Sequence, residues 1–321
     1  ENPRVGGSNP PLGTTLSHLT QLELSYAPDK GFSRAAQAGR SRLWAFHTAK
    51  SGEAGQMSEK IRQYWDERAG QNAGELTATT QDVWMRHLEV ATLIGLIEEL
   101  APPAGARIAD MGCGDGNTLL ALAPRFRDYR FSGFDYAPQM IETANNNLAA
   151  LGAEGSNLQF SVGDVTDPVT STGEASLDIA MTDRCLINLD DSAAQFRALG
   201  EIARTLKPGG HYLAIENFHE GQDAMNAARA AVGLPEIQVR WHNHFFHEAE
   251  FRAEAERHFE TIEIREFASA YYYATRVIYS AMCKMQGIDP DYQHEIHQLA
   301  VKLPAMGAYS PIRLVILRKK G

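Results

Sequence analysis

The middle of the chain, from residue 107 to residue 215, alternates short apolar segments with longer amphipathic ones. Short apolar segments are typical of buried strands, and the amphipathic ones suit helices that pack one face on a sheet. This alternation predicts a parallel sheet with crossover helices, that is, a doubly wound Rossmann-like α/β fold. The expected strands are residues 107–111, 129–134, 158–162, 177–181 and 211–215. The expected helices between them are residues 117–123, 138–151 and 193–206.

The segments on either side of this core have different expected roles. Before it, residues 57–106 predict a helical cover, whose longest helix (82–100) ends at Ala101-Pro102-Pro103. The core itself spans residues 107–218. After it, residues 219–310 predict lid insertions and a sixth strand, and 311–321 the last strand. Residues 259–267 and 312–317 are the expected closing strand pair.

Residues 1–56 differ in composition from the rest. Gly, Pro, Ser, Thr and Asn dominate the opening, and the first methionine is Met57. The segment Gly6-Gly7-Ser8-Asn9-Pro10-Pro11 can be encoded by the usual T-arm sequence of a transfer-RNA gene. We therefore expect residues 1–56 to be a non-native or disordered extension that is dispensable for function, with the folded domain at 57–321.

Composition narrows the class of protein. The formal net charge of −10 argues against a nucleic-acid partner, since proteins that bind nucleic acids usually present a basic face. We find no apolar run near the roughly 20 residues of a membrane span, and no signal-peptide pattern. Three widely spaced cysteines fit reduced thiols, so we expect a cytoplasmic protein with no membrane partner.

Acidic side chains follow three successive predicted strands. Asp110 begins the glycine-rich turn Asp110-Met111-Gly112-Cys113-Gly114-Asp115-Gly116, Asp135 ends the second strand and Asp164 follows the third. The carboxyl ends of adjacent parallel strands meet at one crevice, so we expect the three carboxylates to converge on one ligand. A dinucleotide fingerprint would have glycine at position 117, where this chain has Asn117, which argues against a dehydrogenase.

These motifs resemble those of the class I methyltransferases that use S-adenosylmethionine (SAM). Residues 108–116 are similar to their first motif, Gly133-Phe134-Asp135 with Met140 to the second, and Gly163-Asp164-Val165 to the third. Leu206-Lys207-Pro208-Gly209-Gly210 resembles the turn before their fifth strand. The resemblance implies a seven-stranded sheet of order 3-2-1-4-5-7-6 whose last strand is antiparallel. It also implies SAM as the cofactor of a methyltransferase.

The resemblance implies a role for several residues. Gly112 and Gly114 would lie beneath the methionine part of SAM, Asp135 would hold the ribose and Asp164 would face the adenine amino group. Asp183 and Arg184 would face the methyl-transfer site, with an ion pair that stabilises the loop as the alternative. The full expected cofactor set is Asp110, Gly112, Cys113, Gly114, Asp135, Tyr136, Met140, Asp164, Val165, Asp183, Tyr64 and Arg86.

The candidate catalytic residues follow the fourth and fifth strands. Thr182-Asp183-Arg184-Cys185 stands where nitrogen methyltransferases for bases or glutamine often have an Asn/Asp-Pro-Pro-Tyr/Phe turn. In Trp241-His242-Asn243-His244-Phe245-Phe246-His247, the histidines lack zinc-site spacing, so we expect no metal. A substrate-facing lid with a histidine base is one interpretation, and a lid without one is the other. The expected catalytic residues are His242, His244, Glu216 and Arg184.

The function that these features favour is O- or N-methylation of a small molecule in an enclosed pocket. An RNA or protein methyltransferase and a non-catalytic SAM-binding module remain as alternatives. A small-molecule acceptor is the expected partner, and a homodimer is left open.

Overall fold

The computed structural model describes residues 59–65, 67–68 and 81–321. They all lie in one compact unit, Thr48–Gly321. The predictions for residues 1–56 therefore lie outside the described residues. Residues 59–65 and 67–68 are helical, in agreement with the helical cover expected there.

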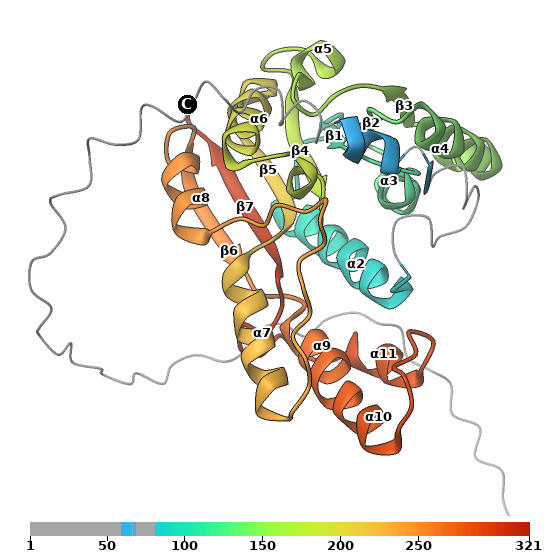
Figure 1. Cartoon of the computed structure of the whole chain (residues 1–321). Helices are drawn as coiled ribbons and strands as arrows, with labels where there is room; N and C mark the ends of the chain where they lie inside the picture. The colour runs from blue at the N-terminus through green and yellow to red at the C-terminus, as the bar shows by residue number, and fades with distance from the viewer. Residues whose placement is uncertain (1–58, 66, 69–80) are drawn as a thin grey trace, which may run out of the picture. The chain divides into compact units, whose positions relative to one another are not determined.

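One seven-stranded sheet forms the centre of the unit (Figure 1). The order is β3-β2-β1-β4-β5-β7-β6, which confirms the order implied by the family resemblance. Strand β7 pairs antiparallel with both β5 and β6, and the other neighbours are parallel. The strands are β1 (Arg107–Met111), β2 (Arg130–Asp135), β3 (Leu158–Val162), β4 (Leu177–Asp183), β5 (Leu206–Asn217), β6 (Phe259–Arg265) and β7 (Ile312–Lys319).

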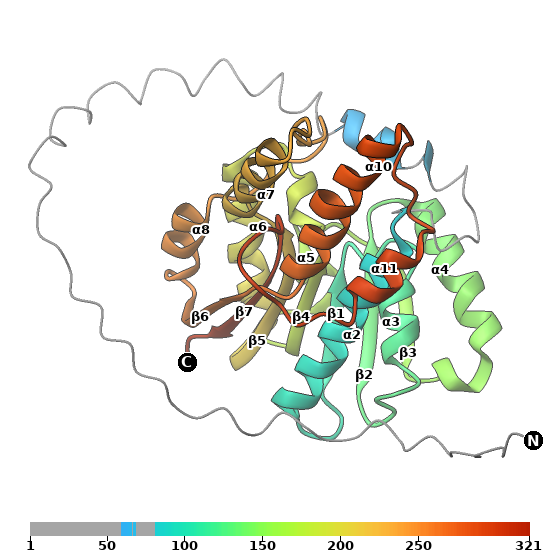
Figure 2. The ribbon, with the colours of Figure 1, turned by 90° about the horizontal axis from the view of Figure 1, so that it is seen from below.

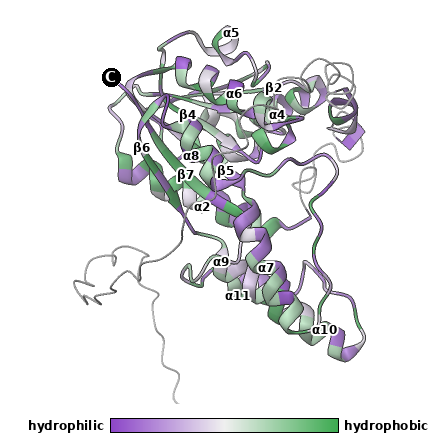
Figure 3. Ribbon diagram, turned by 60° about the vertical axis from the view of Figure 1, so that its left-hand side comes forward, coloured by the Kyte–Doolittle hydropathy of each residue, from purple (hydrophilic) through white to green (hydrophobic). Residues whose placement is uncertain are grey.

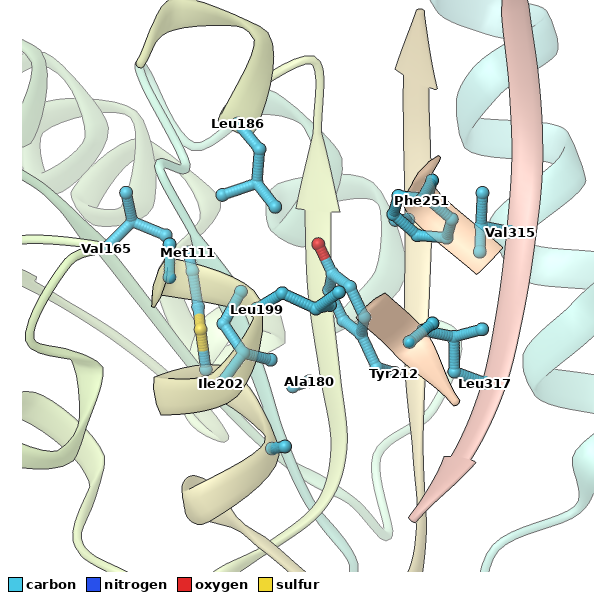
Figure 4. Packing of buried hydrophobic residues seen from close by; sticks show 14 of the residues in the cluster. Met111, Val165, Ala180, Leu186, Leu199, Ile202, Tyr212, Phe251, Val315 and Leu317 are labelled. Carbon is cyan, nitrogen blue, oxygen red and sulfur yellow. The ribbon is translucent and has the colours of Figure 1, made fainter. Parts of the chain in front are cut away.

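Side chains alternate between the two faces of the sheet along each strand, and helices pack against the apolar side chains of both faces. On one face, Met111 and Tyr212 pack in a cluster with Leu199 of α6 (Ser192–Thr205) and Phe251 of α8 (Glu248–Ala255), as Figure 4 shows. On the other face, residues such as Ile108 and Leu213 pack with helices from before and after β1. The helices represented there include α2 (Val83–Leu100) and α3 (Asn117–Leu122), with side chains of α4 (Pro138–Leu151) at the margin. A further short helix, α5 (Pro168–Thr172), precedes β4.

Two insertions gather beyond the carboxyl ends of the central strands. The first is α7 (His219–Ala231) with the segment that follows it. The second lies between β6 and β7 and contains α9 (Ser269–Tyr272), the π-helix η3 (Tyr273–Tyr279), α10 (Ser280–Gln286) and α11 (Glu295–Ala300). Figures 1 and 2 show α7 close to this second group, and Arg229 of α7 donates a hydrogen bond to the carbonyl of Arg276 in η3. The second insertion therefore contains a tyrosine-rich helix with a π segment.

The distribution of apolar residues follows this layering. In Figure 3, β7 is mostly hydrophobic, whereas α10 carries both hydrophobic and hydrophilic residues. Among the described helices, none is long and apolar enough to cross a bilayer.

Candidate functional site

The carboxyl ends of the central strands open on one cavity of ≈ 570 Å³. Its wall combines the glycine-rich turn after β1 with the ends of β2, β4 and β5, and with the loop after β3. The helical residues 59–65 and 67–68, the start of α2, α7 and the π-helix η3 close the remaining sides. The volume falls in the range of small-molecule sites. A cofactor-sized ligand and a small second ligand can therefore share this space.

The glycine-rich turn has a backbone that ordinary residues avoid. Gly112 and Gly114 have φ of 75° and 54°, in the left-handed region that favours glycine. At Gly112 a Cβ atom would also lie 2.2 Å from the Sγ atom of Cys185, in the loop after β4. The turn is thus pressed against the neighbouring strand end, which explains why a residue without a side chain is required there.

Asp110 is a buried carboxylate on the cavity wall. It is 2% exposed, and its Oδ1 atom has no hydrogen-bond partner among the described residues. Burial, with Asp183 nearby, raises its pKa to about 8. An unpartnered buried carboxylate is costly unless a cation or donor meets it. The cavity thus offers Asp110 to a cationic ligand.

Asp135 and Asp164 line the cavity, as does Tyr136. The Asp135 carboxylate accepts hydrogen bonds from the backbone N–H of Gly114 (3.0 Å) and of Ala137 (2.9 Å). The Asp164 Oδ1 atom accepts from the N–H and hydroxyl of Thr166. Together with Asp110 these side chains meet at one cavity, as the strand pattern predicted.

The helical residues 59–65 contact this acidic end of the cavity. Arg62 lies 3.7 Å (Nη2 to Oδ2) from Asp164, and its guanidinium lies over the ring of Tyr136. Trp65 also lines the cavity. Of the twelve predicted cofactor residues, the cavity wall contains all except Tyr64, whose ring instead stacks on His242.

Asp183 and Arg184, at the end of β4, belong to a buried ion-pair network and also line the cavity. Arg86 of α2 binds Asp183 at 2.9 Å (Nη1 to Oδ2), and Arg184 binds Glu89 at 3.0 Å (Nε to Oε1). Burial raises the pKa of Glu89 to about 7, although the charge of Arg184 opposes the shift. The two interpretations of Asp183-Arg184, ion pair and site residues, are therefore compatible.

The three predicted bases lie in different surroundings. Glu216 is fully buried and is absent from the cavity wall. Its carboxylate accepts hydrogen bonds from the Thr182 hydroxyl (2.9 Å) and from the backbone N–H of Leu186 (2.9 Å), with longer bonds to the flanking amides. Glu216 thus holds the loop after β4, and the structure does not bring it to the reacting atoms.

His244 is likewise turned away from the cavity. Its Nε2 atom lies 3.0 Å from the Ser192 hydroxyl, and its backbone carbonyl accepts from Gln195. The next histidine of the 241–247 segment, His247, stacks on His219 with 4.4 Å between the ring centroids. These contacts fasten the loop to α6 and α7.

His242 alone of the three bases lines the cavity. Its ring stacks on Tyr64 at 4.6 Å and meets the edges of Trp65 and Trp241. Burial, together with the charges of Arg240 and Arg68, lowers its pKa to about 4. The imidazole is therefore neutral near pH 7, and its Nδ1 atom has no hydrogen-bond partner among the described residues.

Several wall residues were not predicted from the sequence. Asn217 ends β5, is 7% exposed and has an unpartnered Oδ1 atom within the described part of the chain. Tyr272 and Arg276 reach the wall from the insertion before β7. The alternation of side chains along β5 could have indicated Asn217 in place of Glu216, had the register been known. Other additions include Ile61, Arg68, Asp82, Gln222, Met225, Arg240 and Tyr292.

Comparison of this chain with known proteins points to methyltransferases. A family model described as "Methyltransferase domain" matches residues 108–210. An O-methyltransferase of Pyrenophora dematioidea is 31% identical over 150 residues, covering 41% of this chain and 54% of that protein. The O-methyltransferase cnsE of Penicillium expansum is 28% identical over 172 residues, covering 52% and 55%. The chain thus spans about half the length of these relatives.

A solved structure agrees with the fold. Magnesium protoporphyrin IX methyltransferase of Synechocystis, with S-adenosylhomocysteine (SAH) bound, superposes with a TM-score of 0.53 at 12% identity, over 82% of this chain and 99% of that one. Residues 108–210 thus match a methyltransferase domain, and the fold is that of the SAM-dependent methyltransferases. SAM is the cofactor that this similarity supports. The sheet order, the glycine-rich turn and the acidic strand ends are the features that it shares with the family.

Proposed function

We propose that this methyltransferase transfers the methyl group of SAM to an oxygen or nitrogen atom of a small molecule. The observation that carries the proposal is the single cavity that joins the glycine-rich turn and its carboxylates to a second end walled by α7 and η3. SAM carries a sulfonium and an ammonium group, which suit the unpartnered carboxylate of Asp110. The O-methyltransferases among its relatives add support for an oxygen acceptor.

The proposed roles follow from the positions on the wall. Gly112, Gly114 and Asp110 would hold the methionine part of SAM, while Asp135 would bind the ribose and Asp164 the adenine. The sulfonium is already a good leaving group, so the protein mainly aligns nucleophile, methyl carbon and sulfur. Arg184 lies at the end of β4, next to the turn, where it can orient the acceptor. His242 is the base candidate that we retain.

Two other functions fit the same cofactor motifs. A methyltransferase for RNA would need a basic surface, whereas the chain carries a net charge of −10. A non-catalytic SAM-binding module would have no use for a second, enclosed end of the cavity. We also propose a cytoplasmic protein, because the three described cysteines are free thiols. A homodimer remains a proposal without a supporting contact.

Calorimetry and product analysis test the proposal together. The protein should bind SAM and SAH, and should not bind NAD. With methyl-labelled SAM and a panel of phenols, alcohols, amines and carboxylic acids, we expect the label to appear in a small molecule. SAM binding without transfer to any panel compound, but with transfer to added RNA or protein, would contradict the small-molecule acceptor.

A further inference from the structure

Both acidic and basic side chains line the cavity. Around the glycine-rich turn the wall carries Asp110, Asp115, Asp135 and Asp164, with Arg62 beside Asp164. The described wall also carries Arg184, Arg240 and Arg276. Of these, Arg184 and Arg276 lie near Tyr272, on the part of the wall that the insertion before β7 forms. The local potential of such side chains selects ligands of the opposite charge.

Two carboxylates beside these arginines already form ion pairs. Asp183 is bound by Arg86 and lies 3.6 Å (Oδ1 to Nε) from Arg184. Asp82 is bound by Arg276. These acids therefore neutralise the guanidiniums beside them and are poorly placed to receive a proton or a cationic substrate.

Arg240 differs from Arg184 and Arg276. It lies on the loop before His242, is exposed, and forms no ion pair with the described residues. The charge of Arg240 nevertheless acts on the cavity wall, because this charge helps to lower the pKa of His242. A guanidinium without a carboxylate partner at a cavity wall is suited to an anionic ligand, since its planar fork matches a carboxylate.

Tyr272 adds a neutral hydrogen-bond donor near the guanidinium groups of Arg276 and Arg184. It projects from α9 onto the cavity wall, and both Arg276 and Arg184 lie near enough to oppose the rise of its pKa. Burial still raises that pKa to about 12, so the phenol keeps its proton and can donate a hydrogen bond. Arg276 also lies over the Tyr272 ring, 5.4 Å from its centroid. This tyrosine is thus a rigid donor beside Arg184.

The surroundings of the reacting atom argue against an acceptor that must lose a proton. A hydroxyl acceptor needs a base, yet Glu216 and His244 are bonded away from the cavity. His242 is enclosed by three aromatic rings, and a base with so low a pKa gives little help. An ammonium-bearing acceptor would be repelled by the guanidinium of Arg240, which is unpaired within the described residues. A carboxylate needs no base and is attracted by it.

We propose that the acceptor is a small carboxylic acid, held by Arg240, Arg184 and Tyr272, and that the methyl group is delivered to a carboxylate oxygen. This inference rests on the proposed function. In the step, a lone pair of the carboxylate oxygen forms the new O–C bond while the C–S bond breaks and its electron pair stays on sulfur. The products are a methyl ester and neutral SAH, and no proton is released.

Product chemistry distinguishes this acceptor from the others. The probes are benzoate, cinnamate, phenylacetate, succinate and citrate, each with its amide, together with phenol, benzyl alcohol, benzylamine and phenyl phosphate. With methyl-labelled SAM, we expect label in products that release volatile labelled methanol on mild base treatment, as methyl esters do and ethers or methylamines do not. A dye assay in weak buffer should detect no proton release per SAH formed.

Binding gives a second readout that does not depend on turnover. Carboxylates should raise the Tm of the SAH complex, and their amides should not. Arg240→Gln should raise the KM or Kd for the acid about tenfold or more and leave the Kd for SAM unchanged. Arg197→Gln, an exposed arginine of α6 outside the cavity wall, is the matched control and should change neither.

Different results would contradict the carboxylate acceptor and the proposed function. Base-stable labelled products from a phenol, alcohol or amine would overturn the carboxylate inference and leave the proposed function standing. The inference also fails if no acid shifts the Tm of the SAH complex, or if Arg240→Gln behaves as Arg197→Gln does. Loss of the proposed function would instead appear as an absence of SAM binding in the same calorimeter.

Discussion

The backbone N–H of Gly114 donates a hydrogen bond to the Asp135 carboxylate, with 3.0 Å between N and Oδ2. This bond joins the glycine-rich turn after β1 to the end of β2. Together with the bond from the backbone N–H of Ala137, it orients the carboxylate at the cavity wall. The shape of the cofactor site and its main polar group therefore depend on the same contact.

The first prediction concerns Asp135. We expect Asp135→Ala to weaken SAM binding roughly ten- to a hundredfold, because a hydrogen bond to a charged group contributes about 1.5–3 kcal/mol. Isothermal calorimetry of SAM measures the effect. Asp128→Ala is the control, since Asp128 is exposed just before the opposite end of β2. Equal affinities in the two variants would remove Asp135 from the cofactor site.

The second prediction uses the raised pKa of Asp110, about 8 in the cavity without SAM. A cation binds the charged carboxylate, so the affinity for SAM should increase as the pH rises from 6 towards 8, by up to about tenfold per unit. SAH lacks the sulfonium and should show a smaller dependence. Asp110→Asn should abolish the difference between the two ligands. A SAM affinity that is flat with pH in the wild type would contradict the role of Asp110.

The same carboxylate predicts a change in stability. The pKa of an unfolded aspartate is about 3.9, so the native state without SAM binds more protons than the unfolded state between about pH 4 and pH 8. The contribution of Asp110 to stability is therefore full below pH 4 and is lost as the pH rises through 8. At pH 9, Asp110→Asn should be more stable than the wild type by about 1–3 kcal/mol. At pH 5 the two should be closer, as urea unfolding can measure.

Another prediction concerns the close approach at Gly112. Gly105→Ala and Gly112→Ala both place a side chain on a left-handed backbone (φ of 79° and 75°), which costs roughly 1–2 kcal/mol. A Cβ atom at Gly105 meets nothing within 4 Å, whereas one at Gly112 would lie 2.2 Å from the Cys185 Sγ atom. Gly112→Ala should therefore cost about 1–3 kcal/mol more.

A double variant separates the two causes at Gly112. Adding Cys185→Ala to Gly112→Ala removes the sulfur atom and should recover most of the extra loss. Urea unfolding of the wild type and the three variants gives the comparison. If Gly105→Ala and Gly112→Ala are equally destabilising, the contact with Cys185 is not what requires glycine at this position.

Most of the cofactor-binding half of the cavity could be predicted from the sequence. Strand ends, a glycine-rich turn and acidic residues at fixed places are local signals, so Asp110, Asp135 and Asp164 could be predicted to meet. The expected strand of residues 211–215 was too short, because β5 begins at Leu206. Leu206 pairs with Leu177 of β4, and the register shifts before the next pair. Such an irregularity leaves no mark on the apolar pattern.

The acceptor half was much less predictable, because its residues come together through distant contacts. His242, His244 and His247 lie within six residues, yet their partners are Tyr64, Ser192 and His219. Composition alone cannot assign one histidine to the cavity and two to the framework. Likewise, Glu216 and Asn217 are neighbours at the end of β5, and only the pleat of the strand decides which of them lines the cavity.

The last prediction concerns His242. A base that deprotonates a hydroxyl acceptor would contribute about 10²–10⁴-fold to kcat, and its loss would remove the dependence of the rate on pH. With a carboxylate acceptor no proton is transferred, so we expect His242→Gln to lower kcat by less than about tenfold. The effect should fall mainly on KM, because His242 packs between Tyr64 and Trp241 on the wall.

Two controls make the His242 test decisive. His244→Gln should lower the Tm rather than KM, since it loses the contact with Ser192 that fastens the loop. His242→Phe keeps the aromatic packing and removes both ring nitrogens, so it should behave as His242→Gln does or better. The wild-type rate should stay flat between pH 6 and 9 at saturating SAM and acid. The opposite result would be a fall in kcat of a hundredfold or more in both His242 variants, together with a pH-dependent limb that the wild-type profile shows and the variants lack. That result would make His242 a base and the acceptor a hydroxyl.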